Sequence, residues 1–352
     1  MRRRLVTSCM MSIRRTLGSL PLSVEAATET LPKTLGSNNV VIKIHAVSLN
    51  FRDVGILYGR YPAKSIDGGI IASDCAAEVV AVGDAVEDFK LGDHVVPIFD
   101  INDIDDYIDD DVAALGGDAQ GVLREYAVFE AKQLVHLPEY LSWEEASTLA
   151  CAGVTAWNVL DLPSDASGKN MSVLLQGTGG VSMFSLLLCI AAGVQPIITS
   201  SSDQKIAAIK KLHPSVQGIN YKTTPDVAAE VRRITNGRGV DVVVNNTGPA
   251  SIIQDLDALR QKNGHVSLVG FLDGFKAEWD QSAILGFMSK RASLRGIKVG
   301  SKKDYIQLFD FLEKHKIALT PLIDRIFPFS ESREACDYLY SGKHVGKVVI
   351  KV

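Results

Sequence analysis

Short apolar runs alternate with stretches of helical periodicity through the second half of the chain. Four runs rich in Val, Ile and Leu are typical of buried parallel strands: 173–176, 194–199, 240–245 and 265–270. The stretches 203–212 and 226–236 have helical spacing, with Asp203 expected as an N-cap and Gly237 as a stop. Because strands that alternate with helices build a parallel sheet with helices on both faces, this pattern predicts a doubly wound α/β domain.

The first third and the end of the chain follow a different pattern. Positions 40–47 alternate between buried and exposed types, and Gly-Asp turns follow at 83–84 and 92–93. Residues 14–29 are typical of a first β-hairpin, and 347–352 of a final strand. These features favour an antiparallel, mostly β region.

The first buried run ends on the segment Gln-Gly-Thr-Gly-Gly-Val-Ser, residues 176–182. Glycine allows the tight turn and lets backbone amides approach a pyrophosphate, and the next helix points its positive end at the phosphates. Ser182 stands at the third glycine position, where close helix packing must tolerate a hydroxymethyl group. The segment predicts a dinucleotide site built on Gly177, Thr178, Gly179, Gly180 and Val181. A glycine turn in some other α/β fold is the alternative.

The end of the second run indicates which dinucleotide binds. An NAD site usually places a carboxylate there, whereas this chain has Ser200, Ser201 and Ser202. These hydroxyls can donate to a 2′-phosphate, Lys205 can supply charge, and Tyr221 follows the next short strand. NADPH is therefore favoured over NADH. In the alternative, the serines only start a helix and Lys205 is a solvated surface charge.

Composition agrees with an ordinary two-domain enzyme. The chain has 352 residues, 46% of them hydrophobic, and a net charge of −4, which gives no basic footprint for nucleic acid. No apolar stretch approaches membrane-spanning length. Five scattered cysteines without a CxxC pair favour a reducing compartment. The Arg-rich residues 1–15 resemble a mitochondrial presequence, but the early hairpin leaves it short, so we favour the cytoplasm.

Several collinear segments give the chain a family resemblance. They are 41–53 (VIKIHAVSLNFRD), 77–83 (AEVVAVG), 91–95 (LGDHV), 151–157 (CAGVTAW), the glycine turn, 323–329 (IDRIFPF) and 341–350 (SGKHVGKVVI). Together they resemble the medium-chain dehydrogenase/reductase superfamily, and within it the zinc-independent, quinone-oxidoreductase-like branch that is often labelled alcohol dehydrogenase-like.

The resemblance implies a domain plan. A GroES-like, mostly β catalytic domain would span 14–148 and 300–352, a Rossmann NADP-binding domain 149–299, and an extension 1–13. The active site for a small-molecule substrate would lie in the cleft between the domains. A homodimer would form through the edge strand near 293–298.

Zinc ligands are missing at the positions where zinc-bearing relatives carry them. Those relatives place a Cys in the segment here written 48–51 and a His-Glu pair where this chain has Ser73-Asp74. Their four-cysteine lobe has no counterpart, since no cysteine lies between Cys75 and Cys151. Cys151 alone matches a ligand position, and one thiolate cannot build a tetrahedral site. We therefore expect no metal, and we interpret the Asp-rich run 100–111 as a solvated loop rather than a calcium loop.

A site without a metal favours some reactions over others. Hydride addition to a simple ketone puts charge on one oxygen, which generally needs a strong electrophile. Addition to an enone or a quinone delocalises that charge, so weaker hydrogen-bond donors suffice. We therefore expect reduction of an activated C=C bond or a quinone. The alternatives are an NADP-dependent alcohol dehydrogenase or carbonyl reductase, and a non-catalytic NADPH-binding protein.

The family resemblance places the segment 50–53 near the nicotinamide. Asn50 would then be an amide donor to the substrate oxygen, and Asp53 would cap or orient the adjoining helix. Arg52 either binds substrate or, as we favour, pairs with an acid at the surface. Tyr58 and Tyr61 could each supply a phenol as proton donor or serve only in packing.

In the Rossmann half, the resemblance implies three further contacts with the coenzyme. Asn246 and Thr247 would lie against the ribose or the nicotinamide. Phe271 and Leu272 would flank the carboxamide, and Thr155 would lie near the nicotinamide phosphate. None of these transfers a proton, which suits a reaction in which the coenzyme carries the chemistry.

Overall fold

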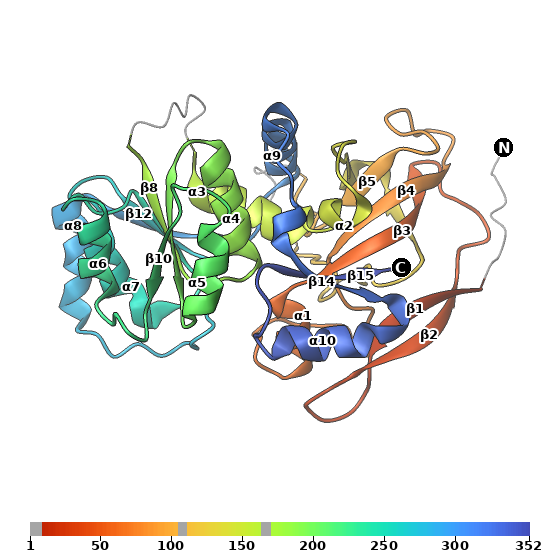
Figure 1. Ribbon diagram of the computed structural model, residues 1–352. Helices are drawn as coiled ribbons and strands as arrows, with labels where there is room; N and C mark the ends of the chain where they lie inside the picture. The colour runs from red at the N-terminus through yellow and green to blue at the C-terminus, as the bar shows by residue number, and fades with distance from the viewer. Residues whose placement is uncertain (1–8, 105–110, 163–169) are drawn as a thin grey trace. The chain divides into compact units, whose positions relative to one another are not determined.

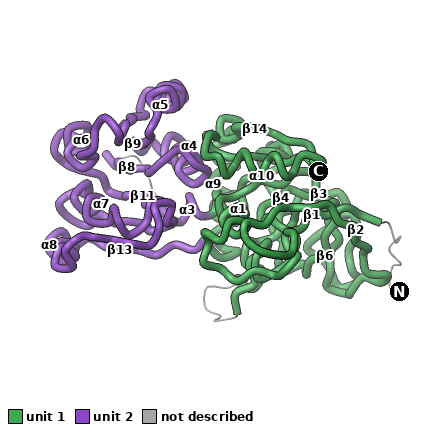
Figure 2. Tube along the Cα trace, turned by 90° about the horizontal axis from the view of Figure 1, so that it is seen from below, with its two compact units in different colours: residues 1–154, 299–352 green, residues 155–298 purple. Residues whose placement is uncertain are grey.

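The computed structural model describes residues 9–104, 111–162 and 170–352. They fall into two compact units, one made of residues up to Val154 together with Val299–Val352, the other of Thr155–Lys298 (Figure 2). The family resemblance implies the corresponding boundaries at 148 and 300. Each unit has its own core and is described by itself.

The sheet of the second unit has the strand order β10-β9-β8-β11-β12-β13, and all of its paired strands are parallel (Figure 1). The strands are β8 (Ser172–Leu175), β9 (Gln195–Ser200), β10 (Gln217–Asn220), β11 (Val242–Asn245), β12 (His265–Leu268) and β13 (Ser293–Gly296). The helices are α3 (Val154–Leu160), α4 (Gly180–Ala191), α5 (Asp203–Lys210), α6 (Val227–Ile234), α7 (Ile252–Ala258) and α8 (Gly286–Lys290). This is the predicted doubly wound α/β fold, and the chain reverses its direction of winding between β8 and β11.

The buried runs of the sequence form the middle of this sheet because both of its faces are covered. Every residue of β8 and of β11 is buried, which explains why these strands read as continuous apolar runs. Leu174, Ile197, Val243 and Val266, from four neighbouring strands, pack into one hydrophobic cluster. β13 lies at the edge of the sheet, as expected, while its use in a dimer stays a prediction.

Two helix ends were predicted from capping residues, and one of the two lies one residue away from its predicted position. The N-cap of α5 is Ser202, whose hydroxyl accepts a hydrogen bond from the backbone nitrogen of Lys205, so the expectation that Asp203 is the cap is wrong by one residue. Asp203 instead accepts a hydrogen bond from the Asn220 side chain. After α6, Gly237 adopts a φ of +86° and bonds back to the helix, as its prediction as a stop requires.

The first unit is mostly β. β1 (Cys9–Arg15) and β2 (Val24–Thr30) form the predicted hairpin, which begins at Cys9, ahead of the expected Arg14. A second sheet has the order β14-β15-β3-β4-β5-β7, with β6 paired to β3. Its strands are β3 (Asn39–Leu49), β4 (Asp74–Val82), β5 (His94–Pro97), β6 (Tyr126–Glu130), β7 (Leu134–His136), β14 (Ile323–Pro328) and β15 (Lys347–Lys351). The helices are α1 (Phe51–Leu57), α2 (Trp143–Ala146), α9 (Lys302–His315) and α10 (Ser332–Tyr340).

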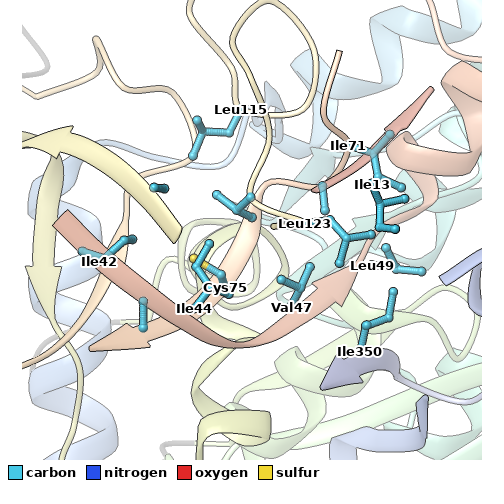
Figure 3. Packing of buried hydrophobic residues seen from close by; sticks show 14 of the residues in the cluster. Ile13, Ile42, Ile44, Val47, Leu49, Ile71, Cys75, Leu115, Leu123 and Ile350 are labelled. Carbon is cyan, nitrogen blue, oxygen red and sulfur yellow. The ribbon is translucent and has the colours of Figure 1, made fainter. Parts of the chain in front are cut away.

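The core of the first unit joins segments from both ends of the chain. Ile13, Leu49, Leu123 and Ile350 lie in one buried cluster (Figure 3). β15 pairs antiparallel with β3, with Val348 opposite Leu49. This pairing places the start of the last strand beside Asn50.

No helix within the described ranges combines the length and the apolar character that a membrane crossing requires.

Candidate active site and nucleotide site

The glycine turn after β8 has the geometry that a diphosphate needs. Gly177 adopts a φ of +76°, which side-chain-bearing residues rarely adopt, and its amide donates to the Thr199 hydroxyl at 3.1 Å. A Cβ atom added at Gly177 or at Gly179 would meet no atom within 4 Å. The space above the turn is therefore open, and the N-terminus of α4 begins there at Gly180. These residues fit the diphosphate of a dinucleotide.

Ser182, at the third glycine position, is part of the turn rather than an obstacle to it. Its buried hydroxyl donates to the carbonyl oxygen of Gln176 at 2.7 Å and accepts from the Asn246 side chain at 3.0 Å. Two hydrogen bonds thus link α4 to the ends of β8 and β11. The hydroxymethyl group is accommodated because it is bonded on both sides.

Side chains predicted from three separate segments gather at the carboxyl edge of this sheet. The Gln176 side-chain oxygen accepts hydrogen bonds from the Thr247 hydroxyl at 2.8 Å and from the backbone amide of Asn246 at 3.2 Å. The Leu272 amide donates to the Asn246 carbonyl at 3.1 Å, and the Phe271 ring stacks on Phe275 with centroids 4.7 Å apart. The turns after β8, β11 and β12 therefore meet, as the dinucleotide site requires.

A buried carboxylate that the sequence analysis did not single out supports this edge. Asp255, on α7, is 2% exposed and accepts hydrogen bonds from Gln176 and Asn245, both at 2.6 Å, and from Ser251 at 3.0 Å. Burial raises the pKa of Asp255 to about 7, against the effect of these donors. The sequence signal was weak, since an acid on a helix is more often solvated.

The predicted adenosine end combines helix capping with exposed groups. The buried Ser200 hydroxyl accepts a hydrogen bond from the Ser202 backbone amide at 3.2 Å, and Ser202 caps α5, while its contact with a phosphate stays a prediction. Ser201 is exposed. The Tyr221 amide donates to the Ser200 carbonyl at 3.2 Å, which brings these two predicted residues together, and Tyr221 is 45% exposed.

The remaining predicted nucleotide residues lie in first turns of helices. Lys205 is partly exposed in the first turn of α5, and Thr155 is buried at the start of α3. Their contacts with a coenzyme stay predictions.

In the first unit, Asn50 is the N-cap of α1, and Asp53, which was expected to cap or orient that helix, is its third residue and holds the Asn50 backbone. The backbone amide of Asn50 donates a hydrogen bond to a carboxylate oxygen of Asp53 at 2.7 Å. Asp53 is 1% exposed, and burial raises its pKa to about 6. Asn50 itself is partly exposed, so its side chain lies at the border between the interior and solvent.

A buried lysine lies directly behind Asn50. The Lys347 ammonium donates to the Leu49 carbonyl at 2.8 Å and to the side-chain oxygen of Asn50 at 2.5 Å. It lies 3.7 Å from a carboxylate oxygen of Asp74, and the two side chains are 2% and 0% exposed. The sequence analysis did not single out Lys347. The available signal was a charged residue directly before the apolar run 348–350.

Four residues stand where zinc-bearing relatives carry their zinc-site segments, and three of them contact the fourth, Asp74. The three are Ser48, Ser73 and Cys151. One Asp74 oxygen accepts from the Ser73 hydroxyl at 2.6 Å, and the other from the Cys151 amide at 3.1 Å and the Ser48 hydroxyl at 3.5 Å. Desolvation raises the pKa of the Cys151 thiol, which disfavours the thiolate that zinc binds.

This donor set does not fit a tetrahedral zinc ion. Two of its members are neutral hydroxyls, and the carboxylate is paired with the Lys347 ammonium, which would repel a dication. Within the described ranges, no group of three or more His, Cys, Asp or Glu side chains could hold a metal. Most of the Asp-rich run, residues 105–110, lies outside these ranges.

The two candidate tyrosines have different surroundings. The Tyr58 ring stacks on Tyr340 of α10, with centroids 3.7 Å apart and planes 4° apart, which is the packing alternative. Tyr61 lies near Arg52, and burial, followed by the effect of the nearby Cys151 side chain, raises its pKa. Tyr61 therefore belongs to the neighbourhood of the polar cluster, whereas Tyr58 packs against α10.

Arg52 is not the surface residue that we favoured from the sequence. It is 6% exposed, donates to the Leu115 carbonyl at 2.7 Å, and its guanidinium lies over the Phe99 ring at 5.1 Å. The expectation of a surface ion pair is wrong because residues 52–57 of α1 are all buried, so the helix offers Arg52 no position at the surface.

A glycine turn at the switch point of a doubly wound sheet, together with a β unit that carries a polar cluster, defines a dinucleotide-dependent dehydrogenase or reductase. Residues 36–139 match the model of the alcohol dehydrogenase GroES-like domain, and residues 180–314 match that of the zinc-binding dehydrogenases. A zinc-type alcohol dehydrogenase-like protein of Schizosaccharomyces pombe is 39% identical over 326 residues, which cover 92% of this chain and 93% of that protein. The chain belongs to the medium-chain dehydrogenase/reductase superfamily and is an NAD(P)H-dependent oxidoreductase.

Solved structures agree with this assignment. A Sinorhizobium meliloti 1021 protein assigned to the alcohol dehydrogenases matches with a TM-score of 0.88 and 31% identity, over 99% of this chain and 100% of that one. A quinone oxidoreductase of Pseudomonas syringae matches with a TM-score of 0.75 and 24% identity, over 97% and 100% of the two chains. At that identity the second likeness concerns the fold alone.

Proposed function

We propose that this protein is a zinc-independent, NADPH-dependent reductase that transfers a hydride to an activated C=C bond or a quinone. The observation that carries the proposal is the engagement of Asp74 by Lys347, Ser73 and the Cys151 amide. This cluster offers a hydrogen-bond donor, Asn50, at its border and no ligand set for a Lewis acid. Such a donor suffices for a delocalised enolate or phenolate, whereas a localised alkoxide generally needs a stronger electrophile.

The residues of the first unit would act by binding and orienting the acceptor. When bound, the nicotinamide supplies the hydride. The Asn50 amide nitrogen donates to the acceptor oxygen, where negative charge develops. Tyr61, in the same neighbourhood, is the favoured source of the proton, and Arg52 has a structural role through Leu115 and Phe99.

Three exposed or partly exposed groups support the preference for NADPH. Ser201 and Tyr221 offer hydroxyl donors, and Lys205 offers a positive charge close by in the chain. The nearest acid, Asp203, accepts a hydrogen bond from the Asn220 side chain, which favours a structural role over binding of the ribose. A fold neighbour named as a 2-octenoyl-CoA carboxylase reductase was solved with NADP, although it is only 21% identical.

Reduction of a carbonyl is the second candidate, because relatives of this chain carry the name alcohol dehydrogenase. Stopped-flow oxidation of NADPH against matched acceptors separates the two. We expect turnover of a water-soluble quinone and of 2-cyclohexenone, and little or none of cyclohexanone. Preferential turnover of cyclohexanone would favour carbonyl reduction. Tight NADPH binding with no turnover of any acceptor would favour a non-catalytic protein.

The zinc-independence of the reaction has its own test. After exhaustive chelation, turnover and bound metal are measured on the same sample. We expect turnover to be unchanged and zinc to be substoichiometric. Loss of turnover on chelation that added zinc restores would overturn the proposal.

A further inference from the structure

Lys347 has a charged side chain in the interior of the first unit, where burial is costly unless the charge is paired and hydrogen-bonded. At 2% exposure it meets the Asp74 carboxylate at 3.7 Å, the Leu49 carbonyl at 2.8 Å and the Asn50 side-chain oxygen at 2.5 Å. The two shorter contacts are to the residues at the end of β3. Asp74 could neutralise the lysine by itself, so the close contact with Asn50 calls for a separate explanation.

We propose that Lys347 is a positioning residue that fixes the side-chain amide of Asn50 in one of its two orientations. An amide group can turn by 180° and exchange its oxygen for its nitrogen, but an ammonium group only donates hydrogen bonds. Lys347 therefore accepts only the orientation in which Oδ1 of Asn50 points inward. Nδ2 then points away from the lysine, with the Ser73 hydroxyl at 3.5 Å.

The same contact makes the Asn50 amide a stronger donor. A positive charge on the oxygen side of an amide polarises it, and hydrogen bonds in a chain strengthen one another at low dielectric. Asp74 keeps the pair neutral overall, and its own oxygens are held by Ser73 and the Cys151 amide. This inference rests on the proposed function, in which Asn50 Nδ2 donates to the acceptor oxygen.

A purely structural role is the competing explanation, since Lys347 also ties β15 to the end of β3. Removing the lysine alone would leave the Asp74 charge unpaired in the interior and could unfold the protein. The informative variant is therefore the neutral pair K347M/D74N, which removes both charges and keeps the side-chain volumes. K351M is the matched control, because Lys351 lies on the same strand with an exposed side chain.

The experiment is a double-mutant cycle between the neutral pair and N50A, with steady-state kinetics on the quinone or enone and coenzyme binding by calorimetry. We expect the neutral pair to lower kcat by about tenfold, a modest part of the loss typical of a missing oxyanion donor. Coenzyme affinity and the thermal midpoint should stay close to those of K351M. In the N50A background, the neutral pair should change kcat by less than about twofold, because the amide through which Lys347 acts is gone.

Two outcomes would overturn the inference. One is a neutral pair with the kcat of the wild type. The other is a loss of kcat that multiplies with the N50A loss, since a structural defect acts regardless of Asn50. The proposed function fails separately: if N50A alone retains full turnover, Asn50 is not the donor, whatever the neutral pair does. Absence of turnover in the wild type overturns both.

Discussion

The carboxylate of Asp255 accepts a 2.6 Å hydrogen bond from the side-chain nitrogen of Gln176, the residue that precedes the glycine turn. The oxygen of the same Gln176 side chain accepts from the Thr247 hydroxyl. The Gln176 side chain thus connects the Asp255 carboxylate on α7 to the turns after β8 and β11 by hydrogen bonds. The protonation state of Asp255 is therefore linked to the edge of the sheet where we propose that the nucleotide binds.

This linkage predicts a pH-dependent stability. Burial raises the pKa of Asp255 from 3.8 to about 7, so the folded protein keeps a proton that the unfolded chain releases near pH 4. The contribution to stability is complete below about pH 4 and is lost as the pH rises through about 7, at up to about 1.4 kcal/mol per pH unit. Urea denaturation across this range should show the free energy of unfolding falling with pH.

The variant D255N provides the comparison, because asparagine has no titrating proton. Its free energy of unfolding should depend less steeply on pH than that of the wild type. Asp53, whose pKa burial raises to about 6, titrates in both proteins, so the difference between the two slopes reports Asp255 alone. Equal slopes would contradict the assignment.

A second prediction concerns the open space above the glycine turn. Gly179 has an ordinary φ of −81°, serves as the N-cap of α4, and has no atom within 4 Å of an added Cβ. Threonine is about as good an N-cap as glycine, so G179T should fold with an unchanged thermal midpoint. Its side chain would occupy the space of the diphosphate.

Loss of two charge-assisted hydrogen bonds of about 1.5 kcal/mol each would weaken NADPH binding by roughly 100-fold. Calorimetry measures the affinity, and differential scanning fluorimetry the midpoint. A G179T protein that binds NADPH normally would show that the phosphates lie elsewhere.

The choice of coenzyme can be tested by reversing one charge. K205E should weaken NADPH binding by about tenfold or more while leaving NADH binding within about twofold, because in the proposed site residue 205 would meet only the 2′-phosphate. K210E is the matched control, since Lys210 is exposed in the last turn of the same helix. Equal losses for both coenzymes in K205E would refute the phosphate assignment.

The parts of the site that depend on local sequence were predictable. The glycine turn needs a positive φ at Gly177 and, at Gly179, space for a ligand to approach the backbone. Glycines at these adjacent positions indicate both requirements from the sequence alone. The cap of α5 was misplaced by one residue, because Ser202 and Asp203 are both good caps and only the backbone decides between them.

Contacts made by strand pairing were not predictable. Lys347 and Asn50 are 297 residues apart, and they meet only because β15 pairs with β3 in one particular register. A one-residue shift would turn Lys347 to the other face of the sheet. Arg52 was misjudged for a related reason. Residues 52–57 of the seven-residue helix α1 are all buried, and this depends on the segments packed around the helix, which the periodicity of so short a stretch does not reveal.

The two tyrosines after α1 form a matched pair for the last prediction. Tyr61 lies near the polar cluster, whereas the Tyr58 ring stacks on Tyr340. Removing one hydroxyl leaves each ring in place, so both phenylalanine variants should fold normally. Y61F should lower kcat by about 100-fold, the range of a lost general acid, and Y58F by less than about twofold. Steady-state kinetics with the preferred acceptor decides the matter, and a Y61F enzyme as active as Y58F would require a proton donor other than either tyrosine.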